Sequence, residues 1–301
     1  MGRRVTLRDV AERSGVSPAT VSFVLNEAPG QSISAATRDR VRQAATELGY
    51  VPHSLARALR EGNSRLVLLE AGRFPWTRML DEFIAGLDAE LAAHDHRLLV
   101  SVTGANGSRH GLDASLQPRA VLDLPALYAR PDREIADGGW IDGMAAHYAT
   151  QIEYLHARGH RRIAVAAPAT TNPFISLMTT HIHSAAAALD ISVLATLELD
   201  TTGAAGTAPE IPASITAVAA ISDEVALAAL AALADRGRAV PDDIAVIGLG
   251  DAVAGRLWRP ALTTVRVDTH TYGRRTAREI LDLPAGDARP APSTVVLRTS
   301  A

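Results

Sequence analysis

The sequence predicts two different folds in one chain, an all-α helix-turn-helix head and a larger α/β body. Three observations support this division. Short capped helical segments separated by glycine fill the first fifty residues, a polar stretch follows at residues 61–65, and apolar strand-like runs then alternate with helical periodicity. With 301 residues, of which 47% are apolar, the chain is long enough to form more than one hydrophobic core.

The first predicted helix begins after Thr6. Thr6 and Asp9 have the spacing of a capping box, in which the two side chains satisfy backbone N–H groups at the start of a helix. Gly15 follows, and glycine tolerates the positive φ of a tight turn, so we expect the helix to end there. The apolar face of this helix consists of Leu7, Val10 and Ala11.

The second predicted helix begins at Ser17 and Pro18, a capping residue followed by a residue favoured in the first helical turn. Its inner face consists of Val21, Val24 and Leu25. Its outer face consists of Pro18, Ala19, Ser22 and Phe23. Two short helices joined by a glycine turn form a helix-turn-helix, whose second helix enters the major groove of DNA. The same pattern also fits an ordinary helical hairpin in a protein core.

A third predicted helix favours the DNA-binding interpretation, because three helices can share one small core. Ser34 is placed to cap this helix, and Gly49 to end it. Its apolar face consists of Val41, Ala44, Ala45 and Leu48. We expect an extended segment containing Pro52 to follow and to lead into a short amphipathic helix that ends near Arg60.

The body alternates strands and helices in the order of βαβ units. We predict strands at residues 66–70, 97–102, 120–124, 163–167, 217–221, 244–249, 263–267 and 294–297. Helices are predicted at residues 77–93, 142–157, 223–235 and 272–283, with another that ends near residue 189. This order implies parallel sheets covered by helices on both faces, and such sheets bind ligands beyond the carboxyl ends of their strands.

The charge distribution separates the head from the body. Residues 1–64 contain nine Arg and six Asp or Glu, a net charge of +3, which leaves −6 on the remainder. A basic head on an acidic body is expected when only the head meets phosphate groups. The chain contains no cysteine, which excludes disulfides and cysteine-based metal sites. It has no apolar run of roughly 18 residues and no signal-peptide pattern, so we expect a cytoplasmic protein that does not contact the membrane.

Several spaced sequence words run through the head as far as Leu59. They are T-L-x-D-V-A, G-V-S-x-x-T-V-S, V-L-N, T-R-x-x-V, and L-G-Y-x-P followed by A-R-x-L. In these words the head resembles the lac repressor (LacI/GalR) family of bacterial transcription regulators. The resemblance implies that three residues face base edges: Pro18, Ala19 and Phe23. It also implies that six residues contact phosphates or support the motif: Thr6, Ser17, Thr20, Ser22, Asn26 and Tyr50.

The same resemblance implies a hinge helix that folds on DNA. Its predicted DNA-contacting residues are Ala56, Arg57, Leu59 and Arg60. Leu59 would enter the minor groove at the centre of a palindromic operator bound by a homodimer, where an apolar wedge kinks the duplex.

Phe23 departs from the family pattern, in which many members carry Arg or His at this position. A phenylalanine offers only apolar contact, for example to a thymine methyl group. The alternative is that Phe23 packs against the loop at residues 27–33.

The second half of the chain resembles the effector domain of the same family. The matching segments are residues 155–165, 222–237, 240–251 and 260–268. That domain is similar to periplasmic sugar-binding proteins of type I, in which two α/β lobes close on a small ligand. The resemblance implies a DNA-binding domain at residues 1–52, a hinge and linker at 53–64, and an effector-binding and dimerisation domain at 65–301. Strands that cross between the lobes are expected near Ile141 and Val265.

Three ligand-holding positions of the family differ in this chain. His181 stands in place of the usual Arg, Ser222 in place of Asn, and Gly250 in place of the first Asp of a G-x-D-D sequence. Aromatic side chains after the first strand are able to stack on a ligand ring, with polar groups as its hydrogen-bonding partners. Five residues are therefore candidates for effector binding: Phe74, Trp76, His181, Ser222 and Asp223. The alternative is that the aromatic residues pack between the lobes and the polar residues cap helices.

Three functions fit the sequence. We expect a homodimeric repressor of a palindromic operator, modulated by a sugar-like or nucleoside-like metabolite, with no cofactor. The second is a DNA-binding regulator whose effector pocket is degenerate and which is controlled without a small ligand. The third is a solute-binding protein or an enzyme, for which the support is weakest. The chain lacks a G-x-S-x-G elbow and a phosphate-cradling lysine loop, and its histidines at 94, 96, 181 and 183 lack the spacing of metal ligands.

Overall fold

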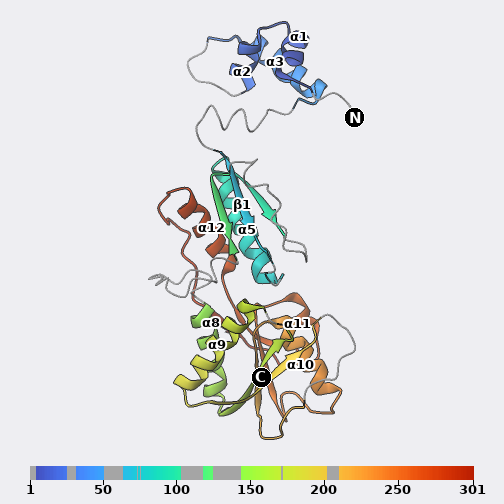
Figure 1. Ribbon diagram of the computed structural model, residues 1–301, viewed down its shortest axis with the longest axis vertical. Helices are drawn as coiled ribbons and strands as arrows, with labels where there is room; N and C mark the ends of the chain where they lie inside the picture. The colour runs from blue at the N-terminus through green and yellow to red at the C-terminus, as the bar shows by residue number, and fades with distance from the viewer. Residues whose placement is uncertain are drawn as a thin grey trace. The chain divides into compact units, whose positions relative to one another are not determined.

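The computed structural model describes residues 5–25, 32–50, 64–72, 74, 76–102, 118–124, 144–170, 172–201 and 210–301. The chain divides into two compact units, residues 1–65 and residues 66–301 (Figure 1). The predictions for Asn26, for the hinge residues Ala56, Arg57, Leu59 and Arg60, and for the first crossing near Ile141 concern residues outside the described ones. They stay predictions.

The head is a bundle of three helices, α1 (Leu7–Ser14), α2 (Pro18–Leu25) and α3 (Ala35–Leu48). The predicted capping box is present. The Thr6 hydroxyl accepts a hydrogen bond from the backbone N–H of Asp9, and the Asp9 carboxylate accepts one from the N–H of Thr6 at 2.6 Å. Gly15 and Gly49 end α1 and α3 with φ angles of 69° and 65°, a left-handed conformation that glycine adopts without strain.

One small hydrophobic core holds the three helices together. Its buried members are Val10, Ala11, Val21, Val24, Val41, Ala44 and Ala45. Tyr50, which directly follows Gly49, packs against this core. Arg13 in α1 also pairs with Glu47 in α3 at 2.6 Å. An exposed pair of this kind contributes only about 0–1 kcal/mol, so the buried apolar residues account for most of the stability of the bundle.

The first lobe of the body contains a three-stranded parallel sheet with the order β2-β1-β3. Its strands are β1 (Leu66–Glu70), β2 (Arg97–Ser101) and β3 (Ala120–Asp123). Its described helices include α5 (Arg78–Ala93) and, from much later in the chain, α12 (Thr269–Ile280), which lie side by side (Figure 1). Glycine permits this close approach. A Cβ atom at Gly86 would lie 1.9 Å from the carbonyl oxygen of His270, and one at Gly273 would lie 2.1 Å from that of Phe83.

The second lobe contains a six-stranded sheet with the order β5-β4-β6-β7-β8-β9. Its strands are β4 (Arg162–Pro168), β5 (Ser192–Leu199), β6 (Ala217–Ala220), β7 (Ala245–Leu249), β8 (Thr263–Arg266) and β9 (Thr294–Val296). Its helices are α8 (Met144–Ala157), α9 (Pro173–Ala188), α10 (Asp223–Ala234) and α11 (Val253–Leu257). Figure 1 shows α8 and α9 on one side of the sheet and α10 on the other. Strands β6 and β7 are buried along their whole length, as expected for strands covered on both faces.

The predicted α/β body with parallel sheets is confirmed, with three differences. Strand β5 was not predicted. Among the described strands it forms an edge of the sheet and pairs with β4 alone, and its exposed residues interrupt the apolar run by which the other strands are recognised. Helix α11 was also not predicted, because it is only five residues long. Strand β9 runs antiparallel to β8, since the chain leaves the second sheet after β8, forms α12 against α5, and then returns. None of the described helices is both long and apolar enough to span a lipid bilayer.

Candidate DNA-binding face and ligand pocket

Helix α2 presents one face to the core of the head and the other to solvent. Val21 and Val24 are buried, whereas Pro18 and Ala19 are exposed and the side chain of Phe23 is 39% exposed. Three of the four residues predicted for the outer face are therefore exposed, and the fourth, Ser22, is half-buried. This face therefore offers mainly apolar side chains to a partner.

The first turn of α2 is fixed by Ser17. Its hydroxyl oxygen accepts a hydrogen bond from the backbone N–H of Thr20 at 3.1 Å, and the two hydroxyl groups lie 2.9 Å apart. The carbonyl oxygen of Ser17 accepts from the N–H of Val21 at 3.0 Å. Ser17 thus caps the helix. The N-terminus of a helix attracts phosphate groups, because its first N–H groups are unpaired and carry partial positive charge.

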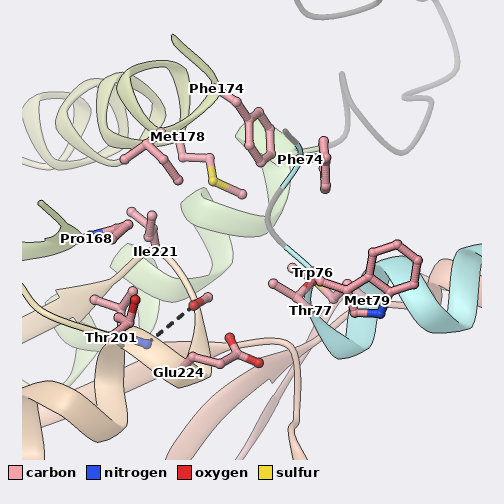
Figure 2. Close-up of a pocket in the computed structure, with 13 residues that line it drawn as sticks. Phe74, Trp76, Thr77, Met79, Pro168, Phe174, Met178, Thr201, Ile221 and Glu224 are labelled. Atoms are coloured by element: carbon pink, nitrogen blue, oxygen red, sulfur yellow. Dashed lines mark hydrogen bonds between the residues drawn. The ribbon is translucent and has the colours of Figure 1, made fainter. Parts of the chain in front are cut away.

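The body contains a pocket of about 300 Å³ (Figure 2). Four described lining residues come from the first lobe. Phe74, Trp76 and Thr77 precede α5, and Met79 lies in its first turn. The others come from the second lobe: Pro168, Phe174, Ile175, Met178, Thr201, Ile221, Ser222, Glu224 and Val225. The pocket therefore lies where the two lobes meet, and carboxyl ends of β1, β4, β5 and β6 lead into its lining, as expected for parallel sheets.

Aromatic side chains from the two lobes meet at this pocket. The rings of Phe74 and Phe174 stack with centroids 4.5 Å apart and planes inclined at 29°. Trp76 is exposed, and its indole Nε1–H donates to the carboxylate of Asp81 at 2.6 Å. Since an indole has a single N–H donor, the surface that Trp76 adds to the pocket is the apolar ring.

Two of the hydroxyl groups at the pocket also cap helices. The Thr77 oxygen accepts from the N–H of Leu80 at the start of α5, and the Ser222 oxygen accepts from the N–H of Val225 at the start of α10. Both contacts are long, at 3.5 Å and 3.4 Å. Ser222 therefore combines the two roles that the sequence left open, pocket lining and helix capping.

His181 and Asp223 are not among the residues that line the pocket. The ring of His181 lies over that of Tyr148, with centroids 6.5 Å apart. Asp223 is buried and accepts hydrogen bonds from the hydroxyl of Thr264 and from the backbone N–H of Ala252. Burial raises the pKa of Asp223 to about 6, against the lowering effect of these two hydrogen bonds. Of the five residues predicted to bind an effector, the structure brings together Phe74, Trp76 and Ser222.

A second buried carboxylate, Asp251, holds three guanidinium groups. Arg256, Arg266 and Arg298 all donate to its two oxygens, from α11, from β8 and from the segment after β9. Burial by itself would raise the pKa of Asp251, but the hydrogen bonds from the three arginines outweigh it and lower the pKa to about 2. The backbone carbonyl of Asp251 also accepts from Arg78 of α5, so this residue links the two lobes.

Two family models match the two parts of the chain. The model described as bacterial regulatory proteins, lacI family, matches residues 6–53, and the periplasmic binding protein-like domain matches residues 152–301. The HTH-type transcriptional regulator CelR of Thermobifida fusca is 30% identical over 331 aligned positions, which cover 99% of this chain and 96% of CelR. The chain belongs to the LacI family. It is therefore a DNA-binding transcriptional regulator.

Further relatives agree with this assignment. The lactose operon repressor of Escherichia coli (strain K12) is 28% identical, over 94% of this chain and 86% of the repressor. The solved structure of the lac repressor dimer bound to operator and the anti-inducer ONPF has a TM-score of 0.72 to this chain at 23% identity, with 99% of each chain covered. That likeness shows the same fold.

The sequence did not identify several residues that line the pocket of this LacI-family member. Phe174 and Met178 lie on α9, where the family's usual ligand-holding words are missing. The one local signal there is Asn172-Pro173, which caps and starts the helix and so fixes where Phe174 lies. Glu224 gives no distinctive signal in the sequence, because an acidic residue in the first turn of a helix is common there.

Proposed function

We propose that this LacI-family member is a repressor that binds a palindromic operator as a homodimer and changes its DNA affinity when a small molecule occupies the pocket between the lobes. The observation that carries the DNA-binding part is the exposed outer face of α2, held by a capped first turn in the family's helix-turn-helix. Pro18, Ala19 and Phe23 would face base edges. Thr6, Ser17, Thr20, Ser22, Asn26 and Tyr50 would contact phosphates or support the motif.

The pocket supports the regulatory part of the proposal. Its lining is shared between the lobes, so a bound molecule would interact differently with different arrangements of the two lobes. A ligand shifts a conformational equilibrium only through such a difference in affinity. The predicted hinge at residues 53–64, with Leu59 at its centre and Ala56, Arg57 and Arg60 beside it, would convert the lobe arrangement into a change in DNA affinity.

An exposed apolar surface supports the homodimer. Val253 and Leu257 lie one turn apart on α11, and Trp258 follows directly. The side chain of Leu257 is 74% exposed and those of Val253 and Trp258 are also exposed. Contiguous exposed apolar residues of this size are typical of protein interfaces, and a dimer matches the two-fold symmetry of a palindrome.

The test is capture of genomic fragments from the source organism on the purified full-length protein at physiological salt, followed by sequencing. We expect enrichment of one palindrome with a pyrimidine–purine step at its centre, because such steps unstack most easily under an apolar wedge. Ala19→Glu should abolish the enrichment by placing a carboxylate on the outer face of α2. Thr46→Glu adds the same charge at an exposed position of α3 and is the matched control. Equal capture by both variants would contradict the proposed face.

A regulator with a degenerate pocket is the second candidate. His181 and Asp223 are not among the described lining residues, which favours this candidate, because two of the five predicted effector-binding residues then contribute no surface to the pocket. Isothermal titration against sugars, nucleosides and polyols tests the predicted sugar-like or nucleoside-like ligand. Heat of binding from one of these classes would exclude the second candidate.

A further inference from the structure

The described lining of the pocket is poor in groups that bind hydroxyls. Its polar side chains are Thr77, Thr201, Ser222 and Glu224, and the oxygens of Thr77 and Ser222 already accept from helix N–H groups. A sugar entering a dry pocket needs a partner for most of its hydroxyl groups, and each buried group left unpaired costs about 1–3 kcal/mol. The described part of the lining therefore disfavours a highly hydroxylated ligand.

The same lining is rich in flat and adaptable apolar groups. The stacked rings of Phe74 and Phe174 and the ring of Trp76 offer aromatic surface, while Met79 and Met178 bring flexible thioether chains. In Figure 2, Met178 lies between Phe174 and Ile221. Aromatic rings stack on planar groups and methionine fills irregular gaps. A volume of about 300 Å³ is at the small end for ligand sites, which suits a molecule of one or two fused rings.

Glu224 gives this pocket its charge preference. Among the described lining residues it is the one with a charged side chain, and Figure 2 shows its carboxylate on the opposite side of the pocket from Phe174. It occupies the first turn of α10, where the helix dipole stabilises a carboxylate. A cationic group would be attracted to this carboxylate and to nearby aromatic faces, whereas an anionic ligand would be repelled.

We propose that the pocket binds a planar aromatic amine, with the ring among Phe74, Trp76 and Phe174 and the protonated amine against Glu224. This assignment rests on the proposed function, in which this pocket is the effector site, and it replaces the sugar-like or nucleoside-like ligand expected from the sequence. The ligand class follows from the contrast, among the residues of the lining that the structure describes, between the apolar aromatic side chains and the carboxylate of Glu224.

The experiment is isothermal titration of the full-length protein with three probes that share one ring system: tryptamine, tryptophol and indole-3-acetate. They carry a cation, a neutral hydroxyl and an anion. Glu224 is exposed, so solvent screens its pairing with an amine, and such a pair is worth about 0.2–1 kcal/mol. We therefore expect tryptamine to bind more tightly than tryptophol by up to roughly 5-fold, and indole-3-acetate to bind most weakly. Cellobiose and cytidine serve as hydroxylated comparison ligands.

Glu224→Gln should remove the preference for tryptamine over tryptophol while leaving the binding of tryptophol unchanged. Glu153→Gln, which alters an exposed carboxylate on α8 outside the pocket, should leave the preference intact. Tighter binding of cellobiose or cytidine than of tryptamine, no binding of tryptamine at millimolar concentration, or the same preference in Glu224→Gln would each overturn the assignment. Genomic capture without ligand is scored separately. A protein that still selects a palindrome but fails these titrations would retain the proposed function and lose this inference.

Discussion

Replacement of Asp251 by Asn should lower the free energy of unfolding by about 2–3 kcal/mol at pH 7. The lowered pKa of Asp251 gives the size of this loss. The pKa falls from 3.8 to about 2, and each pKa unit corresponds to about 1.36 kcal/mol. The folded protein therefore favours the charged carboxylate by about 2.4 kcal/mol. Breaking a buried ion pair costs about 3–5 kcal/mol. We expect the smaller loss, about 2–3 kcal/mol, because solvent screens the charges of two of the three arginines.

The exposed fractions decide which arginine contributes most. Arg298 is 12% exposed, whereas Arg256 and Arg266 are 47% and 55% exposed. Arg298→Gln alone should therefore destabilise the protein by nearly as much as Asp251→Asn does, and Arg266→Gln alone should destabilise it little. Each effect is measured by urea unfolding of the full-length protein. Asp242→Asn, at an exposed carboxylate, is the control and should change stability by less than about 0.5 kcal/mol.

The pH dependence gives an independent check on the same carboxylate. Because the pKa of Asp251 is lower in the folded protein than in the unfolded chain, its contribution is present above about pH 4 and disappears as the pH falls toward about 2. The difference in stability between the natural protein and Asp251→Asn should stay constant from pH 7 to about pH 5 and narrow below about pH 4. A difference below about 1 kcal/mol at pH 7, or one that does not narrow in acid, would refute the reasoning.

Three further changes test other parts of the molecule. Leu59→Ala should weaken binding to the specific operator more than binding to random DNA in fluorescence anisotropy, because a wedge acts only where the central base step opens; equal losses would remove the hinge from the proposal. Gly273→Ala should destabilise the body by more than about 3 kcal/mol in urea unfolding, because the new methyl group meets backbone atoms of Phe83 and Leu87. A smaller loss would mean that α5 and α12 are able to separate. Leu257→Glu should convert the proposed homodimer to a monomer in sedimentation velocity, and a variant that stays dimeric would place the interface elsewhere.

Local signals in the sequence were sufficient for the head and for most of the body. Helix caps act on residues only a few positions away, so a short stretch of sequence is enough to predict them. This holds for the capping residues Thr6 and Ser34 and for the terminating residues Gly15 and Gly49. The central strands are recognisable for a related reason: burial on both faces demands a continuous apolar run. Strand β5 lies at the edge of the sheet, where several of its residues are exposed. It therefore has no continuous apolar run, and the sequence did not predict it.

The ligand pocket could be predicted only in part, because its walls come from distant segments. Phe74 and Phe174 are a hundred residues apart in sequence and 4.5 Å apart as rings. No local sequence pattern predicts that these two rings contact each other. Replacement of a family's ligand-holding Arg by His181 was visible in the sequence, but the direction of that side chain depends on how α9 packs against α8.

Residues that line the pocket alternate along the chain with residues that hold the structure together. Thr77 and Met79 line the pocket, while Arg78 between them donates to the Asp251 carbonyl and pairs with Glu82. Successive residues of a helix point in different directions, so one turn serves both purposes. A molecule that moves the start of α5 would therefore move Arg78 as well. Arg78 contacts the second lobe at Asp251, so a single helical turn carries both a wall of the pocket and a contact between the lobes.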